Sequence, residues 1–564
     1  MSTQNRFNWQ KAIQLGGIAG LIGVLIALVG MVESFDHRDI VAGAISMGWT
    51  MLLLTVLVAA YFSASHQPSK SFSLVASGIT GFIFSLVMSL LAFLIENLDL
   101  RQILVNASPN LLKILTLENG IPNGLISLIV ISTIFGILGG ALYILPAKIR
   151  KAISLGLGMV AFLGLMEDII QVTIASTGSG NSAIGWMFGR GTQSGLSIIG
   201  AIVVFGVVIG GNLLWGTNAP KINAQVSKMP PNRQRSLRIL GYGLILLVVL
   251  YLPVVLGLYL TEVVNVTGLF ILMGLGLNIV VGFAGLLDLG YVAFYAIGAY
   301  TVGVLTSLSG QLSTAFEWNF WWALPVSIFI CVMAGVVLGI PVLNMRGDYL
   351  AIVTLGFGEI IRILALSDFL KPHIGGSQGI VNIPPPDFLG VLLNKPQTLY
   401  YLIVAGCILA LFVSQRLRDS RLGRSWKAMR EDEDVAQAMG INLVATKLLA
   451  FATGAAFSGL SGTILAVKLG TIYPHSFALL ISINVLSLII VGGMGSIPGV
   501  FIGGLLLAGM PELLREFAEY RLLIYGALLV VMMQVRPEGF WPEETHKREF
   551  HEDAPDVTPV QEAA

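Results

Sequence analysis

The chain has 564 residues, of which 55% are hydrophobic and 11% are charged, with a formal net charge of +1 and a mean hydropathy of +0.84. Apolar runs of about 20 residues, the length of a transmembrane helix, recur along the whole chain. They exclude an outer-membrane barrel, because only a helix satisfies its own backbone within one such run. The sequence therefore predicts an all-α, polytopic integral membrane protein that lies in the lipid bilayer, with no nucleic-acid partner.

The few cysteines and the N-terminus add little chemistry. Cys331 and Cys407 both fall in predicted spans, and a metal or redox site would need a cluster, so we expect no metal. Arg6 and Lys11 precede an apolar run that is longer than a signal-peptide core. We expect this run to be an uncleaved first helix.

Residues 1–215 form the first predicted module, a membrane module of unknown role. Basic residues flank the turn at 148–151 and fill the linker, whereas the alternate loops are acidic, so six spans start and finish in the cytoplasm. We expect extra helix packing or assembly as the module's role. The spans are predicted near residues 12–32, 40–62, 72–95, 122–145, 152–174 and 195–214.

Residues 216–236 form a predicted cytoplasmic linker with three prolines, and a second module follows at 237–540. Its ten spans bring the total to roughly 16 (about 6 + 10), with both termini cytoplasmic. The loop 368–397 is then extracytoplasmic, and 541–564 is a cytoplasmic tail that we expect to be disordered. The spans are predicted near residues 238–260, 263–283, 291–308, 320–343, 349–367, 398–415, 448–467, 477–493, 497–511 and 521–535.

The segment 416–447 is the one long charged stretch in the interior of the chain, and it is predicted to be cytoplasmic. Residues Trp426 to Met439 contain no Gly or Pro and predict one short helix, which ends at Gly440. Its small or apolar side chains would seat in a cleft on a soluble partner. The alternative is a solvated positive-inside loop.

Glycines interrupt two apolar helices. Asp288 is the only charged residue between Val263 and Phe316, and it lies among Gly282, Gly285 and Gly290. A carboxylate at mid-bilayer costs about 2.5 to 3.5 kcal/mol on insertion scales, so we expect it to face protein, water or a helix N-terminus. Asp288 is either a cap at a cytoplasmic turn or part of a broken helix that lines a pathway.

The second interruption comprises Gly492, Gly493 and Gly495, followed by Pro498 and Gly499. It lies about 210 residues after the first, and each follows an apolar helix, which favours a repeated half with both breaks near a shared pathway. Close helix packing is the alternative reason for glycine here.

Two further sets of charges lie in predicted spans. Glu359 and Arg362 are three residues apart on one helix, so we expect them to share a face and neutralise each other; a substrate clamp for a zwitterion is the alternative. Glu167 and Asp168 either mark a water boundary or pair with Arg190.

Motifs of several enzyme classes are missing from the sequence. It contains no Gly-Lys dipeptide, and therefore no P-loop, and neither H-E-x-x-H nor G-x-S-x-G. The chain is therefore not expected to hydrolyse ATP by that route.

Several motifs resemble one family. Asp434, Val435, Ala436 and Gly440 keep the spacing of the E-A-A-x-x-x-G coupling motif of bacterial ABC importer permeases, with Asp and Val in place of Glu and Ala. The following GINLVATK, and the segments at 276–300, 346–362 and 491–499, resemble LivM-type branched-chain amino acid permeases. The resemblance covers roughly 240–540. GGSQGI at 375–380 departs from the family's usual GGPNGI.

The resemblance implies the permease subunit of an importer for branched-chain amino acids in the bacterial cytoplasmic (inner) membrane. It implies a homologous second permease subunit, two cytoplasmic ATPase subunits that carry ATP and Mg, and an extracytoplasmic substrate-binding protein. The chain itself would need no cofactor. The ATPase-coupling residues would be Glu433, Asp434, Ala436, Ala438, Gly440, Ile441 and Asn442, and the candidate pathway residues Gly285, Asp288, Gly290, Glu359, Arg362, Gly492, Gly493 and Gly495.

Other functions stay open at this point. Related permeases carry urea, amides or other amino acids. An ion-coupled secondary transporter would use Asp288 and Glu359, and a non-transporting scaffold would use only the helices.

Overall fold

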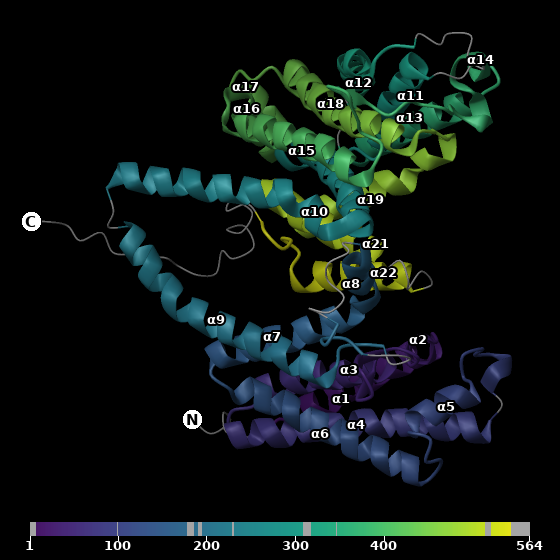
Figure 1. Cartoon of the computed structure of the whole chain (residues 1–564), viewed down its shortest axis with the longest axis vertical. Coiled ribbons are helices and arrows are strands. Elements are labelled where there is room, and N and C mark those ends of the chain that lie inside the picture. The colour runs from purple at the N-terminus through teal and green to yellow at the C-terminus, as the bar shows by residue number, and fades with distance from the viewer. Residues whose placement is uncertain are drawn as a thin grey trace, which may run out of the picture. The chain divides into compact units, whose positions relative to one another are not determined.

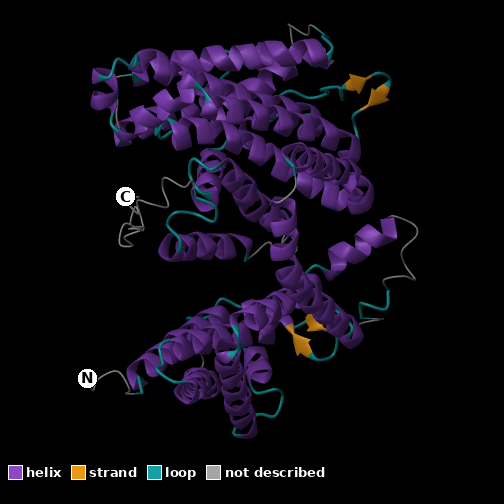
Figure 2. Ribbon diagram, turned by 90° about the vertical axis from the view of Figure 1, so that its left-hand side faces the viewer, coloured by secondary structure: helices purple, strands orange, loops and turns teal. Residues whose placement is uncertain are grey.

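The computed structural model describes residues 7–98, 100–176, 185–189, 194–227, 230–307, 317–343, 345, 347–513 and 520–542. It divides into two compact units, 1–247 and 248–564 (Figure 1). Among the described residues, the strands form two small hairpins (Figure 2). Eleven helices within the described residues are long and apolar enough to cross a membrane, or up to twelve if one bent pair is a single span. The chain is a polytopic helical membrane protein, as predicted, and the number of 16 spans stays a prediction.

Three helices of the first unit begin at serine caps. The side chains of Ser46, Ser69 and Ser108 each accept a hydrogen bond from the first turn of the helix that follows. The helices are α1 (Trp9–Leu28), α2 (Met31–Phe35), α3 (Met47–Ser65), α4 (Lys70–Asn97), η1 (Leu100–Gln102), α5 (Pro109–Leu115), α6 (Asn123–Ile144), α7 (Ala147–Leu165), α8 (Glu167–Ser176) and α9 (Ile198–Ser227).

Two of the predicted spans in this unit need correction. The span predicted near 40–62 begins instead at Met47, because 39–46 form a hairpin of β1 (Asp39–Val41) and β2 (Ile45–Ser46). The span predicted near 152–174 is bent by 64° between α7 and α8. Asp168, after this bend, forms an ion pair with Arg38 at 2.6 Å. The predicted partner Arg190 lies outside the described residues.

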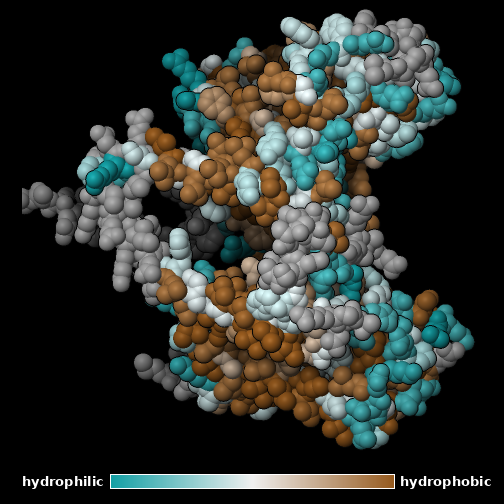
Figure 3. All heavy atoms as spheres, viewed as in Figure 1, coloured by the Kyte–Doolittle hydropathy of each residue, from teal (hydrophilic) through white to brown (hydrophobic). Residues whose placement is uncertain are grey.

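Small residues let α4 and α6 pack closely. A Cβ atom added to Gly136 of α6 would lie 2.6 Å from the backbone oxygen of Ser77 and 3.0 Å from Cα of Gly81, both on α4. Such contacts are the usual means by which membrane helices associate. Large apolar side chains such as Leu21, Leu25 and Leu54 stay exposed, and hydrophobic residues cover much of the visible face of this unit (Figure 3). These side chains suit a surface that faces lipid.

The second unit is built around α18, a largely buried helix in contact with α11 and α12. Its elements are the C-terminal part of α10 (Pro231–Leu277), η2 (Asn278–Phe283), α11 (Val292–Thr306), α12 (Phe320–Val342), α13 (Asp348–Leu366), α14 (Lys371–Ile374), η3 (Gly376–Gln378), β3 (Asp387–Phe388), β4 (Val391–Leu392), α15 (Pro396–Asp419), α16 (Arg421–Glu431), α17 (Glu433–Ala438), α18 (Leu443–Leu469), η4 (Pro474–Phe477), α19 (Leu479–Gly492), α20 (Ile497–Gly504), η5 (Leu505–Gly509), α21 (Met510–Leu513) and α22 (Arg521–Val535).

Spans in the second unit differ from the prediction in continuity and length. The two spans predicted at 238–260 and 263–283 lie in α10 and η2, and two helical parts of α10 meet at a kink where Gly257 adopts a non-helical φ of 67°. Helix α11 has 15 residues, about 22 Å, which is shorter than the hydrocarbon core of a bilayer. The division between the units also falls inside α10, so the predicted domain limits at 216 and 237 stay predictions.

We expect the α4–α6 packing to tolerate no added methyl group. Gly136→Ala should lower the stability of the chain by about 1–3 kcal/mol, because the new Cβ meets backbone of α4. Thermal unfolding in detergent measures the change. Gly158→Ala in α7 is the control, since its Cβ would meet nothing within 4 Å. An equal shift in both variants would contradict the packing argument.

Candidate functional site

The charged segment 416–447 contains two short helices, so the prediction of one helix over 426–439 is wrong. Helix α16 ends at Glu431, and Asp432 adopts an extended backbone (φ −157°, ψ 117°). The Asp432 carboxylate accepts hydrogen bonds from Asp434 N at 2.8 Å and Val435 N at 3.0 Å. Asp432 is therefore the N-cap residue of a new helix, α17. Asp is preferred at this position because its carboxylate accepts hydrogen bonds from the free N–H groups of the first turn.

The end of α17 is as predicted. Gly440 has a φ of +85°, and its N–H donates to the carbonyl of Gln437 at 3.0 Å. Ile441 N donates back to the carbonyl of Ala436, and Asn442 then caps α18 by accepting from Ala445 N at 3.1 Å. Gly440, Ile441 and Asn442 therefore fix the turn between α17 and α18.

Helix α17 presents an exposed face. Ala436 points inward and is buried, whereas Asp434 and Ala438 are exposed. Two large apolar side chains share that exposure: Val435 at 59% and Met439 at 80%. Since residues four apart lie on the same side of a helix, these two form one apolar patch. The sequence analysis missed Met439, although its spacing from Val435 was a readable signal.

The inner side of the segment is anchored to α18. Trp426 is fully buried, and its indole donates to the carbonyl of Thr446 at 2.9 Å. The buried Lys447 ammonium donates to Glu433 at 2.9 Å and to the carbonyl of Leu343, just after α12, at 3.2 Å. Glu433, predicted as a coupling residue, therefore serves as an ion-pair partner inside the chain.

The first glycine break is a real interruption. After the π-helical η2, residues 284–291 leave the helix, and Gly285 has a φ of +72°. Asp288 is fully buried; its Oδ1 accepts from Gly290 N at 2.9 Å, and its Oδ2 has no hydrogen-bond donor among the described residues. The hydroxyl of Thr354 accepts from Leu289 N and donates to the carbonyl of Ala351. Asp288 does not cap α11, whose N-cap residue is Tyr291, so the structure shows the broken helix, and its place beside a pathway stays a prediction.

The second break lies against the first. Helix α19 ends at Gly492, and Gly493 and Gly495 adopt φ values of 118° and 78°. The N–H of Gly495 donates at 2.9 Å to Oδ1 of Asn278, a buried residue of η2. The structure therefore joins two breaks that lie 217 residues apart through a side chain that the sequence analysis had not singled out.

Glu359 and Arg362 form the local pair that their spacing predicted. Arg362 Nε donates to both carboxylate oxygens of Glu359 at 3.0 Å, on helix α13. Gly358 of the same helix packs on Gly290, with an added Cβ 3.2 Å from the Cα of Gly290. A role of this pair as a substrate clamp stays a prediction.

A second charged pair lies elsewhere in this unit. Lys468, near the end of α18, pairs with Glu262 of α10, 206 residues away in sequence. Sequence spacing gave no signal for it.

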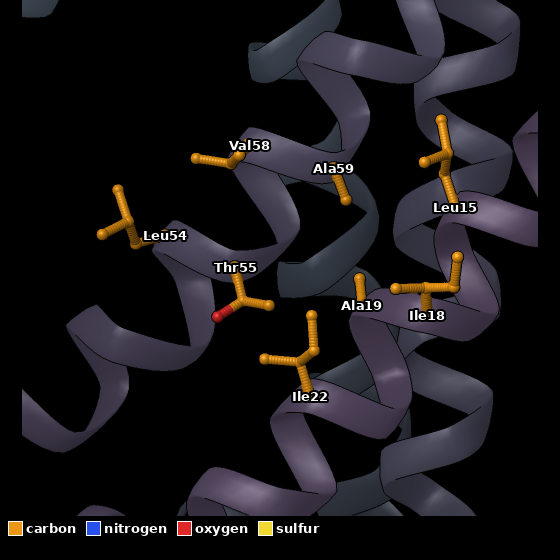
Figure 4. Close-up of a pocket in the computed structure, with 8 residues that line it drawn as sticks. All are labelled: Leu15, Ile18, Ala19, Ile22, Leu54, Thr55, Val58 and Ala59. Atoms are coloured by element: carbon orange, nitrogen blue, oxygen red, sulfur yellow. The ribbon is translucent and has the colours of Figure 1, made fainter. Parts of the chain in front are cut away.

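A groove of about 370 Å³ lies within the first unit, between α1 and α3 (Figure 4). Its one side-chain oxygen, on Thr55, already donates to the carbonyl of Met51 at 2.9 Å. The groove therefore suits an apolar hydrocarbon group, and its lining residues include no charged side chain that could bind the ammonium or carboxylate of an amino acid. It is lined by Leu15, Ile18, Ala19, Ile22, Leu54, Thr55, Val58 and Ala59.

Comparisons place these features among known proteins. Residues 259–533 match the family model described as branched-chain amino acid transport system permease component. The high-affinity branched-chain amino acid transport system permease proteins LivM of Salmonella typhimurium and of Escherichia coli K12 are each 41% identical over 304 residues, which cover 50% of this chain and 69% of the relative. LivH of Escherichia coli K12 is 25% identical over 48% of this chain and 90% of its own length. No solved structure matches the chain.

We expect the buried ammonium of Lys447 to depend on Glu433. Glu433→Gln should lower the free energy of unfolding by about 3 kcal/mol. This is the low end of the range for a broken buried ion pair, because the Glu433 side chain is partly exposed. Adding Lys447→Met to that variant should restore part of the loss. Thermal unfolding measures both. Glu431→Gln is the control, since that side chain is 68% exposed; a double variant no more stable than Glu433→Gln would refute the expectation.

Proposed function

The chain belongs to the family of branched-chain amino acid transport system permeases, and we propose that it is the membrane-spanning subunit of an ABC importer that carries branched-chain amino acids into a bacterial cell across the inner membrane. The relatives named LivM and LivH are both permeases of such systems, which supports a second, homologous permease chain as a partner. Two cytoplasmic ATPase subunits and an extracytoplasmic binding protein complete the proposed assembly.

One observation carries the proposal. The matched region contains α16 and α17, which are fixed to α18 by Trp426 of α16 and by the pair of Lys447 with Glu433 of α17, while the outer side of α17 exposes Val435 and Met439. A motor protein needs a rigid, apolar contact through which to push, and this face supplies one. ATP binding would close the motor dimer, and α16 and α17 would pass the movement to the membrane helices.

Much of the cargo selectivity would then reside in the binding protein. Urea, amides and other amino acids are the alternative cargoes. Uptake of leucine, compared with urea, by the complex in proteoliposomes with its binding protein tests this choice. Faster urea than leucine uptake would contradict the proposal.

We predict that the exposed face of α17 holds the ATPase subunits. The double variant Val435→Glu with Met439→Glu should fold normally, because both side chains are mostly exposed, and should lose the ATPases on gentle purification of the tagged chain. Mass spectrometry identifies what remains bound. Leu389→Glu, at a 92% exposed apolar residue of the β3–β4 hairpin, is the control. Retention of the ATPases by the double variant would mean that the docking surface lies elsewhere.

Asp288 separates an ATP-driven importer from an ion-coupled secondary transporter. Asp288→Asn keeps an acceptor for Gly290 N, so we expect uptake within about twofold of the native chain. Asp288→Leu removes the acceptor at a cost of about 1–3 kcal/mol and should impair uptake. Proteoliposome assays measure both. Uptake that is abolished by Asp288→Asn and driven by an ion gradient without ATP would favour the secondary transporter.

A further inference from the structure

Arg430 ties the cytoplasmic segment to the first glycine break. It lies in the last turn of α16, its side chain is 16% exposed, and its Nη1 donates to the carbonyl of Gly282 at 2.6 Å. The two residues are 148 apart in sequence. This contact was not among the predicted site residues.

The Gly282 carbonyl is available because η2 ends there. The N–H groups of residues 284, 285 and 286 donate to the carbonyls of residues 279, 281 and 280, respectively. The carbonyl of Gly282 is the next one along the chain, and it accepts from Arg430. A guanidinium at this position satisfies a terminal carbonyl and lies at the negative end of the helix dipole. Gly285 makes room for it, since an added Cβ there would lie 2.6 Å from Cγ of Arg430.

The opposite side of η2 contacts the second break. Asn278 accepts from Gly495 N, and an added Cβ on Gly282 would lie 2.6 Å from that same nitrogen. The second break is in turn paired with the chain beyond α22, where Phe540 N donates to the carbonyl of Val491 and Trp541 N to that of Gly492. A displacement of Gly282 would therefore change the contacts at both breaks.

The other contacts that hold the segment are made with α18, which is a continuous α-helix. Trp426 and Glu433 attach α16 and α17 to the first turns of α18, which continues to Leu469. Figure 1 shows α16, α17 and α15 lying along α18. The segment and α18 would thus move as one body. Arg430, in contrast, contacts η2, a π-helical segment that is followed by non-helical backbone and is not part of a continuous α-helix.

We infer that Arg430 is the positioning residue that carries movement of the ATPase-docking segment to the broken helices, so that ATP hydrolysis and opening of the pathway stay coupled. This inference rests on the proposed function. It adds a specific contact between the docking segment and the breaks, separate from the docking face of α17.

The test uses the complete complex, with both permeases, the ATPases and the binding protein, in proteoliposomes. Arg430→Met should keep the ATPases bound and ATP hydrolysis active, while leucine transported per ATP falls about tenfold. Arg430→Lys, which keeps one donor without the fork, should give an intermediate ratio. Arg424→Met is the matched control, because Arg424 lies on the same helix, the charge change is the same, and its side chain donates to the nearby carbonyl of Asp419 at the end of α15.

Three results would overturn the inference: a native ratio of leucine to ATP in Arg430→Met, an equal loss in Arg424→Met, or release of the ATPases by Arg430→Met, which would make Arg430 a docking residue. Should Arg430→Met fail to fold, Arg430→Lys decides, and a native ratio there refutes the role. Failure of the proposed function itself appears differently, as absence of ATPases or of leucine uptake with the native chain.

Discussion

Backbone groups that leave a helix inside a membrane protein must find partners within the protein, and this constraint governs the second unit. At the first break, Gly282 O receives Arg430, Gly290 N reaches Asp288, and Leu289 N reaches Thr354. At the second, Gly495 N reaches Asn278. Each interruption is therefore held by defined hydrogen bonds, and all of these except the bond of Gly290 to Asp288 come from segments distant in sequence.

Glycine at these junctions serves close approach as much as backbone freedom. Gly285 needs both, because it has a positive φ and lies under Arg430. Gly282 lies at the contact between the two breaks, where any side chain would separate Asn278 from Gly495. The two readings of glycine in membrane helices, breaking and packing, thus hold at the same residues.

Sequence reasoning reached what depends on local chemistry. The spacing of Glu359 and Arg362 predicted their pair, and Gly440 predicted a left-handed helix end. It failed at Asp432, because the lack of Gly and Pro from Trp426 to Met439 predicted one continuous helix although Asp is a strong N-cap. The contacts of Arg430 and Asn278 could not be predicted, since they span 148 and 217 residues and no sequence spacing indicates such distant partners. Family resemblance identified the docking segment and the two breaks as candidate functional regions, but the contact between them is visible only in the structure.

The buried carboxylate of Asp288 fits this picture better as a structural group than as an ion carrier. An ionised carboxylate that moved a cation would need a second ligand or a water path, and its neighbours Gly290, Leu289 and Thr354 offer backbone N–H groups and one committed hydroxyl. Its one oxygen without a donor lies in a fully buried turn packed against α13. Such a turn changes its exposure only if η2 and α13 separate. Since Arg430 holds η2, Asp288 would become exposed only after the segment 416–447 has moved. Exposure of this carboxylate would then be a result of pathway opening, whereas movement of Arg430 would be its cause.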